Sequence, residues 1–452
     1  MLYFVLSALL TYGGIDLVGA EDPWSFVVLA DWHGAESFAV KPNVEDDENY
    51  FNAREIFRSI REEHNAEVML LPGDIQTGHW HEPFFNRYLE DTLNITGLSV
   101  NETIRLGAEN CYSAAKKLFS EAGFDEVLLA FGDHELGGNP WQSGSSKVAG
   151  LPIFRERLVA NFNRDERGDF IFDDPIGAAP SRPLGTRFEN TSYAHVHKNA
   201  LFITVDTFYE VLDIEGRTYF ERKLSTGGEG IITGTVAEEH LAWFEYVLTE
   251  ARRIESIKHI FVQAHVPILQ PVRKTDCSGQ FFDLAQNSEF WKLMREHNVD
   301  VYFAGEVHAN TAIKDKYSDL IQVVTRGNRI NNYLSVTVTD NGFSMSSFNE
   351  YGSKWRFNGM YEKYGELVVT KSSSTSSIDS SGSLELVDIS KGPLIQLNFE
   401  KKETYPFRRR QIVGMKHDQF KETLTGQNIT IRSVTSDSSM ENAGVFGRKC
   451  MV

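Results

Sequence analysis

Short runs of apolar residues recur along the first two thirds of the chain, and each is followed by a polar segment. The runs are four to six residues long and do not alternate with polar positions, which is typical of strands buried on both faces. We expect such strands at residues 25–30, 67–71, 126–131, 259–263 and 301–304.

Longer segments between these runs place apolar residues three to four positions apart, a spacing that predicts amphipathic helices. The expected helices cover residues 52–64, 110–122, 151–163, 238–254 and 290–296. Two strand pairs are also expected, at residues 192–197 with 200–205, and at 334–338 with 343–348 across a turn at Asp340-Asn341-Gly342. The alternation of strands and helices from residue 21 to about 338 predicts an α/β fold.

The composition changes near residue 371. Lys371–Ser383 (KSSSTSSIDSSGS) is rich in serine, which favours a flexible connector. Residues 384–399 contain apolar stretches sufficient for one or two strands, and the rest of the chain carries only weak signals. We therefore predict one domain at residues 21–370, a linker at 371–383, and a C-terminal extension at 384–452 whose structure the sequence does not define.

The first residues predict entry into the secretory pathway. Met1–Gly14 is apolar and Val18-Gly19-Ala20 is a small-residue end, so we expect a signal peptide over residues 1–20. No Lys or Arg precedes the apolar core, which leaves a buried first strand or helix as the alternative. The stretch is too short for a membrane anchor, and no other segment reaches spanning length. The chain is therefore expected to be secreted, without a membrane span after cleavage.

Glycosylation triplets agree with secretion, and the composition is that of a globular chain. Four Asn-x-Ser/Thr triplets begin at Asn94, Asn101, Asn190 and Asn428. An apolar fraction of 41% is enough for a sizeable core, and a net charge of -18 argues against non-specific nucleic-acid binding. Only three cysteines are present, so at most one disulfide can form.

Residues of the kinds that bind metals follow five of the expected strands. These segments are Asp31-Trp32-His33, Gly73-Asp74, Gly132-Asp133-His134-Glu135, His265 within Gln263–Pro267, and Gly305-Glu306-Val307-His308. Taken singly, each has an ordinary interpretation as a polar pair, a helix cap, a turn or a core histidine. Because the carboxyl ends of strands in an open sheet face one crevice, all five can converge there.

This order of segments resembles the calcineurin-like metallophosphoesterase superfamily, whose pattern is DxH, GD, GNH(D/E), H and GHxH. The resemblance covers roughly residues 26–348. It implies a four-layer α-β-β-α sandwich with two divalent metal ions at the carboxyl ends of the strands. It also implies hydrolysis of a small-molecule phosphoester by a metal-bound hydroxide.

The resemblance further assigns a role to each of these residues. Asp74 would bridge the two ions, with Asp31, His33 and His308 completing the first ion and Asp133, His265 and Glu306 the second. His134 would protonate the leaving group, and Glu135 would orient the His134 ring and favour its protonated form.

Two positions depart from the family pattern, and both belong to the second ion. Asp133 replaces the usual Asn, and Glu306 replaces the first His of GHxH. The second site therefore becomes richer in carboxylates and is expected to favour Mn²⁺, Mg²⁺ or Ca²⁺, whereas the first should accept Mn²⁺, Fe or Zn²⁺. The added negative charge also supports an alternative, a non-catalytic metal-binding surface protein.

A third possibility is a phosphodiesterase or nucleotide pyrophosphatase instead of a monoesterase. The insertions at residues 78–110 and 137–190 would decide which leaving group fits, and their aromatic residues are Trp80, Phe84, Phe85 and Trp141. Two histidine pairs belong to no motif. His79 and His81 are expected on a surface loop, and His195 and His197 on one side of a strand.

Overall fold

The computed structural model describes residues 22–40, 44, 47–138, 146–208, 213–214, 217–218, 233–269, 281–282, 284–308, 310–327, 332–350, 361–372 and 376–387. Several sequence predictions fall outside the described residues. They are the signal peptide at 1–20, Trp141, Cys277, Cys450, the triplet at Asn428 and the extension beyond residue 387.

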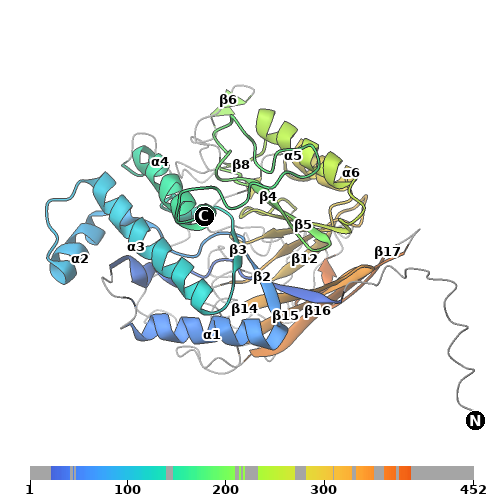
Figure 1. Cartoon of the computed structure of the whole chain (residues 1–452), viewed down its shortest axis with the longest axis horizontal. Coiled ribbons are helices and arrows are strands. Elements are labelled where there is room, and N and C mark those ends of the chain that lie inside the picture. Colours follow the sequence, from blue (N-terminus) through green and yellow to red (C-terminus); the bar gives the residue numbers. More distant parts are fainter. Residues whose placement is uncertain are drawn as a thin grey trace, which may run out of the picture.

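Two mixed sheets form the centre of the described part of the chain (Figure 1). The first sheet has the order β17 (Ser376–Gly382), β16 (Tyr361–Lys371), β15 (Gly342–Glu350), β14 (Asn332–Thr339), β1 (Trp24–Val28), β2 (Ala66–Leu71) and β3 (Glu126–Leu129). The second has the order β18 (Leu386–Val387), β12 (Thr311–Lys314), β13 (Ile321–Val324), β11 (Val301–Ala304), β9 (His259–Gln263), β5 (Ala200–Thr204) and β4 (Tyr193–His197). Short pairs join β8 (Thr233–Gly234) to β10 (Phe281–Phe282) and β6 (Asp213–Ile214) to β7 (Arg217–Thr218).

The apolar runs become strands that are buried on both faces. In β1, Phe26 packs between the sheets, with its ring centroid 5.2 Å from that of Phe202 and 5.1 Å from that of Phe261. Its neighbour Val27 belongs to the other core cluster, which includes the helices. Both faces of the strand are therefore covered, as the lack of polar alternation predicts.

Helices cover the outer faces of the sheets. Figure 1 shows α1 (Glu48–His64) and α3 (Val100–Glu121) along one side, and α5 (Glu238–Ala251) and α6 (Glu289–Glu296) along the other. Phe57 of α1 contacts Phe119 of α3, and Phe244 of α5 contacts Phe290 of α6. The expected four-layer α-β-β-α arrangement is confirmed. The described helices also include α2 (Pro83–Leu93) and α4 (Ser146–Leu158), and none of them is long and apolar enough to cross a membrane.

The structure corrects two predictions about local elements. The helix expected to begin at residue 110 begins at Val100, because Ser99 caps it and Glu102 bonds back to the Ser99 amide in a capping box. Residues 376–382 of the Ser-rich segment, which was expected to be a flexible connector, instead form β17, which pairs antiparallel with β16 from Gly365 to Lys371. Beyond it, β18 adds a short strand beside β12.

Strand direction brings the candidate chemistry to one edge. β1, β2 and β3 run parallel in the first sheet, and β5, β9, β11 and β13 run parallel in the second. The β1–β2 pairing continues beyond the strand ends, where the Asp31 amide donates to Gly73 and the His33 amide donates to Asp74. The segments that carry the polar residues are therefore held by backbone hydrogen bonds as extensions of the sheet.

Candidate metal centre

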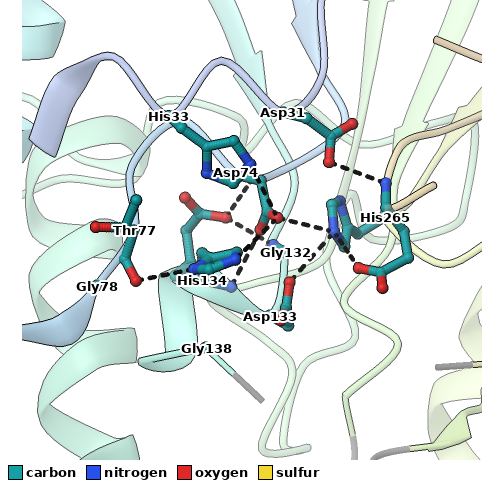
Figure 2. Close-up of polar contacts among 12 residues, drawn as sticks. Asp31, His33, Asp74, Thr77, Gly78, Gly132, Asp133, His134, Gly138 and His265 are labelled. Atoms are coloured by element: carbon teal, nitrogen blue, oxygen red, sulfur yellow. Dashed lines mark hydrogen bonds and ion pairs between the residues drawn. The ribbon is translucent and has the colours of Figure 1, made fainter. Parts of the chain in front are cut away.

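The carboxyl ends of five strands bring the seven predicted metal-binding side chains together. Figure 2 shows five of them, Asp31, His33, Asp74, Asp133 and His265. Asp31 and His33 follow β1, Asp74 follows β2, Asp133 follows β3, His265 follows β9, and Glu306 and His308 follow β11. Their donor atoms form two groups, Asp31 with His33 and His308, and Asp74 with Asp133, His265 and Glu306. Asp74 also lies in a group with His33 and His134, so its carboxylate adjoins both sets.

Three carboxylates surround the His265 ring in the larger group. The Nε2 atom of His265 lies 3.1 Å from Glu306 Oε2, 3.3 Å from Asp74 Oδ2 and 3.5 Å from Asp133 Oδ1. All four side chains are buried. Buried carboxylates this close together repel one another strongly unless a cation or protons compensate their charge.

The smaller group contains two imidazoles and one carboxylate. The Nε2 atoms of His33 and His308 lie 3.3 Å apart, and His308 Nε2 is 3.2 Å from Asp31 Oδ1. His33 Nε2 is 3.8 Å from Asp74 Oδ2, which connects this group to the larger one. Asp31 Oδ2 is buried without a hydrogen-bond partner among the described residues, although a buried oxygen of this kind normally has one.

Backbone carbonyls orient two of the candidate histidine ligands. Nδ1 of His265 lies 2.7 Å from the Pro72 carbonyl, and Nδ1 of His33 lies 3.2 Å from the Gln76 carbonyl. Since a carbonyl only accepts, each Nδ1 must donate, and Nε2 is left to bind a cation. Imidazole nitrogens and carboxylate oxygens aimed at shared points fit divalent cations, so the residues present suit a two-metal site.

The backbone at the site is strained. Twelve described non-glycine residues have a positive φ, and five of them are candidate ligands: Asp31, His33, Asp74, Glu306 and His308, with φ of 52°, 50°, 60°, 70° and 50°. Asp and His tolerate a positive φ better than most residues, whereas Glu, the residue type at position 306, does not share this tolerance. Strain of this kind clusters at functional sites, where the surrounding structure maintains it.

Two glycines make the close approach of these loops possible. A Cβ on Gly132 would lie 2.1 Å from Asp74 Oδ1, and one on Gly73, whose φ is +85°, would lie 2.7 Å from His265 Nδ1. Neither position accepts a larger residue without moving a candidate ligand. The glycine before each acidic residue therefore belongs to the architecture of the site.

A family model matches the part of the chain that carries these side chains. The model described as calcineurin-like phosphoesterase matches residues 25–310, which contain all seven candidate ligands. The chain belongs to this family. Membership supports metal-dependent hydrolysis of small-molecule phosphoesters, and the buried Asp, His and Glu residues fit its two-metal site. No curated protein sequence matches the chain significantly.

Three solved structures align with most of the chain at low sequence identity. A dimetal phosphatase of Danio rerio aligns at 15% identity and a TM-score of 0.41, covering 72% of this chain and 96% of that one. A purple acid phosphatase from yellow lupin (Lupinus luteus) aligns at 11% identity and a TM-score of 0.44, covering 78% and 54%. The protein named PhoD aligns at 12% identity and a TM-score of 0.47, covering 80% and 72%.

His134 lies beside the calcineurin-like site but is more exposed than most of the candidate ligands. Its side chain is 26% exposed, against 2% for Asp74 and 0% for His265. Nδ1 lies 2.8 Å from the Thr77 carbonyl and must donate to it, while Nε2 lies 3.9 Å from Asp74 Oδ2. A substrate bound at the centre can therefore reach the Nε2 edge of the ring.

Glu135 does not occupy the place that the sequence suggested. Its carboxylate accepts from the backbone amides of Asp74, Ile75 and Gly132, at 2.7, 3.1 and 2.8 Å, and the Thr77 carbonyl orients the His134 ring instead. A fully buried carboxylate needs several donors, and the loop amides supply them. Glu135 therefore holds the Asp74 and Gly132 backbones together, and it acts on His134 only when it is ionised, by raising the pKa of that ring.

The loop after Asp74 carries a residue that the sequence left unassigned. The ring of His79 lies 5.8 Å from that of His134, so this part of the expected surface loop borders the site. Phe84, 45% exposed, adjoins His79, whereas Trp80 and Phe85 are core residues that cannot stack on a substrate.

Trp32 packs behind the site against Phe38, Phe57 and Phe119. Sequence spacing alone does not show which of these side chains border the site and which lie in the core.

The carboxylates change the proton affinity of the site. Burial lowers the pKa of His134, but the charges of Asp133 and Asp74 oppose it and bring the pKa to about 9. Burial and the charge of Asp74 raise the pKa of Glu135 to about 8. The pKa of Asp74 is also raised, by burial and then by Asp133, so protons bind this site more tightly in the folded chain than in the unfolded chain.

We expect the metal-free chain to lose stability as the pH rises from 7 to 9. Groups with a raised folded pKa stabilise the fold while protonated, and Glu135 and His134 lose their protons near pH 8 and 9. The free energy of unfolding should fall by on the order of 2 kcal/mol, as measured by denaturant titration in chelator. Cations replace these protons, so the metal-loaded chain should show a smaller fall. An equal fall in both forms would contradict this electrostatic account.

Proposed function

We propose that the chain is a phosphoester hydrolase that binds one divalent cation on each side of Asp74. The observation that carries the proposal is the position of the Asp74 carboxylate, which adjoins both the His33 group and the His265 group. Asp31, His33 and His308 would complete the first cation site, and Asp133, His265 and Glu306 the second. A single buried residue in contact with both sets is what two closely spaced cations require.

The two cations, when bound, would supply an acidic water near neutral pH and positive charge for the phosphoryl oxygens. The chain supplies the remaining parts. Thr77 holds the His134 ring so that Nε2 faces the centre, and from there His134 donates a proton to the leaving oxygen. Glu135 keeps the Asp74 and Gly132 backbones in register with each other, which fixes the distance between the bridge and the acid.

The donor sets predict different metal preferences. The second set contains three carboxylates and one imidazole, a hard and strongly negative environment that favours Mn²⁺, Mg²⁺ or Ca²⁺. The first set combines two imidazoles with Asp31 and the shared Asp74, and it should accept Mn²⁺, Fe or Zn²⁺.

Chelator treatment followed by metal addition tests the function and the substrate class together. The stripped full-length chain should be inactive, and Mn²⁺, Mg²⁺ or Ca²⁺ should restore hydrolysis better than Zn²⁺. Assays on a monoester and a diester of the same chromophore separate a phosphatase from a phosphodiesterase. If no cation restores turnover on either ester, the proposal fails and the alternative of a non-catalytic metal-binding protein takes its place.

We also propose that the chain is secreted and glycosylated. Asn94 and Asn101 are exposed in the structure, which suits glycan attachment, whereas Asn190 Oδ1 accepts a hydrogen bond from Arg164. Expression in a eukaryotic secretory host should yield protein in the medium whose mass falls on endoglycosidase treatment. Substituting Asn94 and Asn101 with Gln should remove most of that shift. Retention of the full-length chain inside the cell would contradict the proposal.

A further inference from the structure

A second group of metal-binding side chains lies at the far end of the sheets from the candidate centre. Glu126 is the first residue of β3, and His195 and His197 lie two residues apart on β4. β3 and β4 are the edge strands of the two sheets, so these three side chains meet where the sheet edges face each other. The carboxyl end of β3 leads instead to Asp133, which places the group at the opposite end of that strand.

Both histidine rings point at one oxygen atom. Glu126 Oε2 lies 3.1 Å from His195 Nε2 and 2.9 Å from His197 Nδ1. The donor atoms of all three residues lie within 4.8 Å of one another. Ligands around a tetrahedral zinc ion are about 3.3 Å apart, given bonds of about 2.0–2.1 Å. The three side chains therefore need little movement to enclose an ion.

The surroundings already orient the rings. Nε2 of His197, the nitrogen that does not face Glu126, lies 3.0 Å from Glu67 Oε2, and Lys198 in turn binds Glu67. A carboxylate on the far nitrogen of a histidine is the usual support for a metal ligand, because it sets the tautomer and the ring angle. The ring of His197 also contacts Trp24, and that of His195 contacts Phe172.

Charge and access also suit a cation. Burial raises the pKa of Glu126, but the hydrogen bonds from His195 and His197 outweigh this effect and bring the pKa to about 2. This carboxylate is therefore charged at neutral pH. The side chains of His195 and His197 are 21% and 14% exposed, which leaves a path from solvent. Two imidazoles and one carboxylate form a donor set that Zn²⁺ accepts, with water as the fourth ligand.

We propose that Glu126, His195 and His197 form a zinc site, separate from the calcineurin-like centre, that links the edges of the two sheets. The ion would replace the protons that the two rings now share with Glu126. Its role would be structural, because the group lies at the opposite end of β3 from Asp133. The competing interpretation is a salt-bridge cluster of protonated histidines that binds no metal.

Counting bound zinc tests the proposal without relying on activity. The metal-stripped full-length chain, His195→Ala and Glu126→Gln are dialysed against micromolar Zn²⁺, and zinc per chain is measured by elemental analysis. Each variant should bind one zinc ion fewer than the parent chain, with its affinity at this site lowered by at least the roughly 10- to 100-fold that loss of a supporting residue costs. Glu126→Gln keeps the shape of the side chain, so it remains informative if His195→Ala fails to fold.

His297→Ala provides the matched control, because this histidine lies at the end of α6 and the charged groups that act on it, Glu245, Arg252 and Glu296, do not belong to the group. It should bind as much zinc as the parent chain. Equal zinc in the parent, His195→Ala and Glu126→Gln would overturn the proposal and favour the salt-bridge cluster. The difference between parent and variants does not depend on catalysis, so failure of the proposed hydrolase function would leave this result interpretable.

Discussion

Replacing Asp74 with asparagine should slow phosphoester hydrolysis by roughly 10³-fold or more, because metal stabilisation of the reaction accounts for several kcal/mol. Asp74 Oδ1 accepts from the His134 amide at 3.0 Å. An asparagine must keep its oxygen there, which places its NH₂ group where Oδ2 now faces His265 and His33. A donor at this point repels both cations, so bound metal should fall along with kcat.

The matched control for Asp74→Asn is Asp315→Asn. Asp315 is also buried and hydrogen-bonded, but it accepts its hydrogen bond from Nε1 of Trp291 in α6. It takes no part in the proposed site. This variant should retain the metal content and activity of the parent chain. Normal turnover by Asp74→Asn, with two cations still bound, would show that Asp74 is not the bridge.

Replacing His134 with alanine should lower kcat by roughly 10²- to 10⁴-fold for esters of poor leaving groups, the usual contribution of a general acid. The effect should be much smaller for a nitrophenyl ester, whose leaving oxygen needs no proton. Bound metal should be unchanged, because the proposed role of His134 is proton donation and all seven proposed ligands remain in this variant. The measurement compares kcat for an alkyl and a nitrophenyl monoester, in parent and variant.

The two esters serve as each other's control, since any general damage to the site lowers both rates alike. An equal loss of kcat on the alkyl and nitrophenyl esters would contradict the role of proton donor. It would leave His134 with a part in binding the phosphate group, which does not depend on the leaving group.

The convergence of the seven side chains could be predicted because each depends on one simple feature, the end of a strand buried on both faces. β9 and β11 occupy the predicted residues 259–263 and 301–304. Once such strands run parallel, His265, Glu306 and His308 can only emerge at the same edge. Asp133 and Glu306, the two departures from the family pattern, also lie together around His265, as the resemblance implied.

Features set by tertiary contacts could not be predicted in the same way. β17 has a serine-rich sequence with no apolar pattern, and it is a strand because β16 offers an unpaired edge to its backbone. Glu135 accepts hydrogen bonds from three amides that belong to two separate loops. The start of α3 is different, since the Ser99-to-Glu102 capping box is visible in the sequence and marks it.

Anomalous diffraction from crystals grown with Mn²⁺ tests the central claim most directly. A bridged two-metal centre should give two peaks about 3.5–4 Å apart, one on each side of the Asp74 carboxylate. Asp31, His33 and His308 should surround the first peak, and Asp133, His265 and Glu306 the second. A single peak, or two peaks with Asp74 bound to only one of them, would contradict the proposal of a bridged two-metal centre.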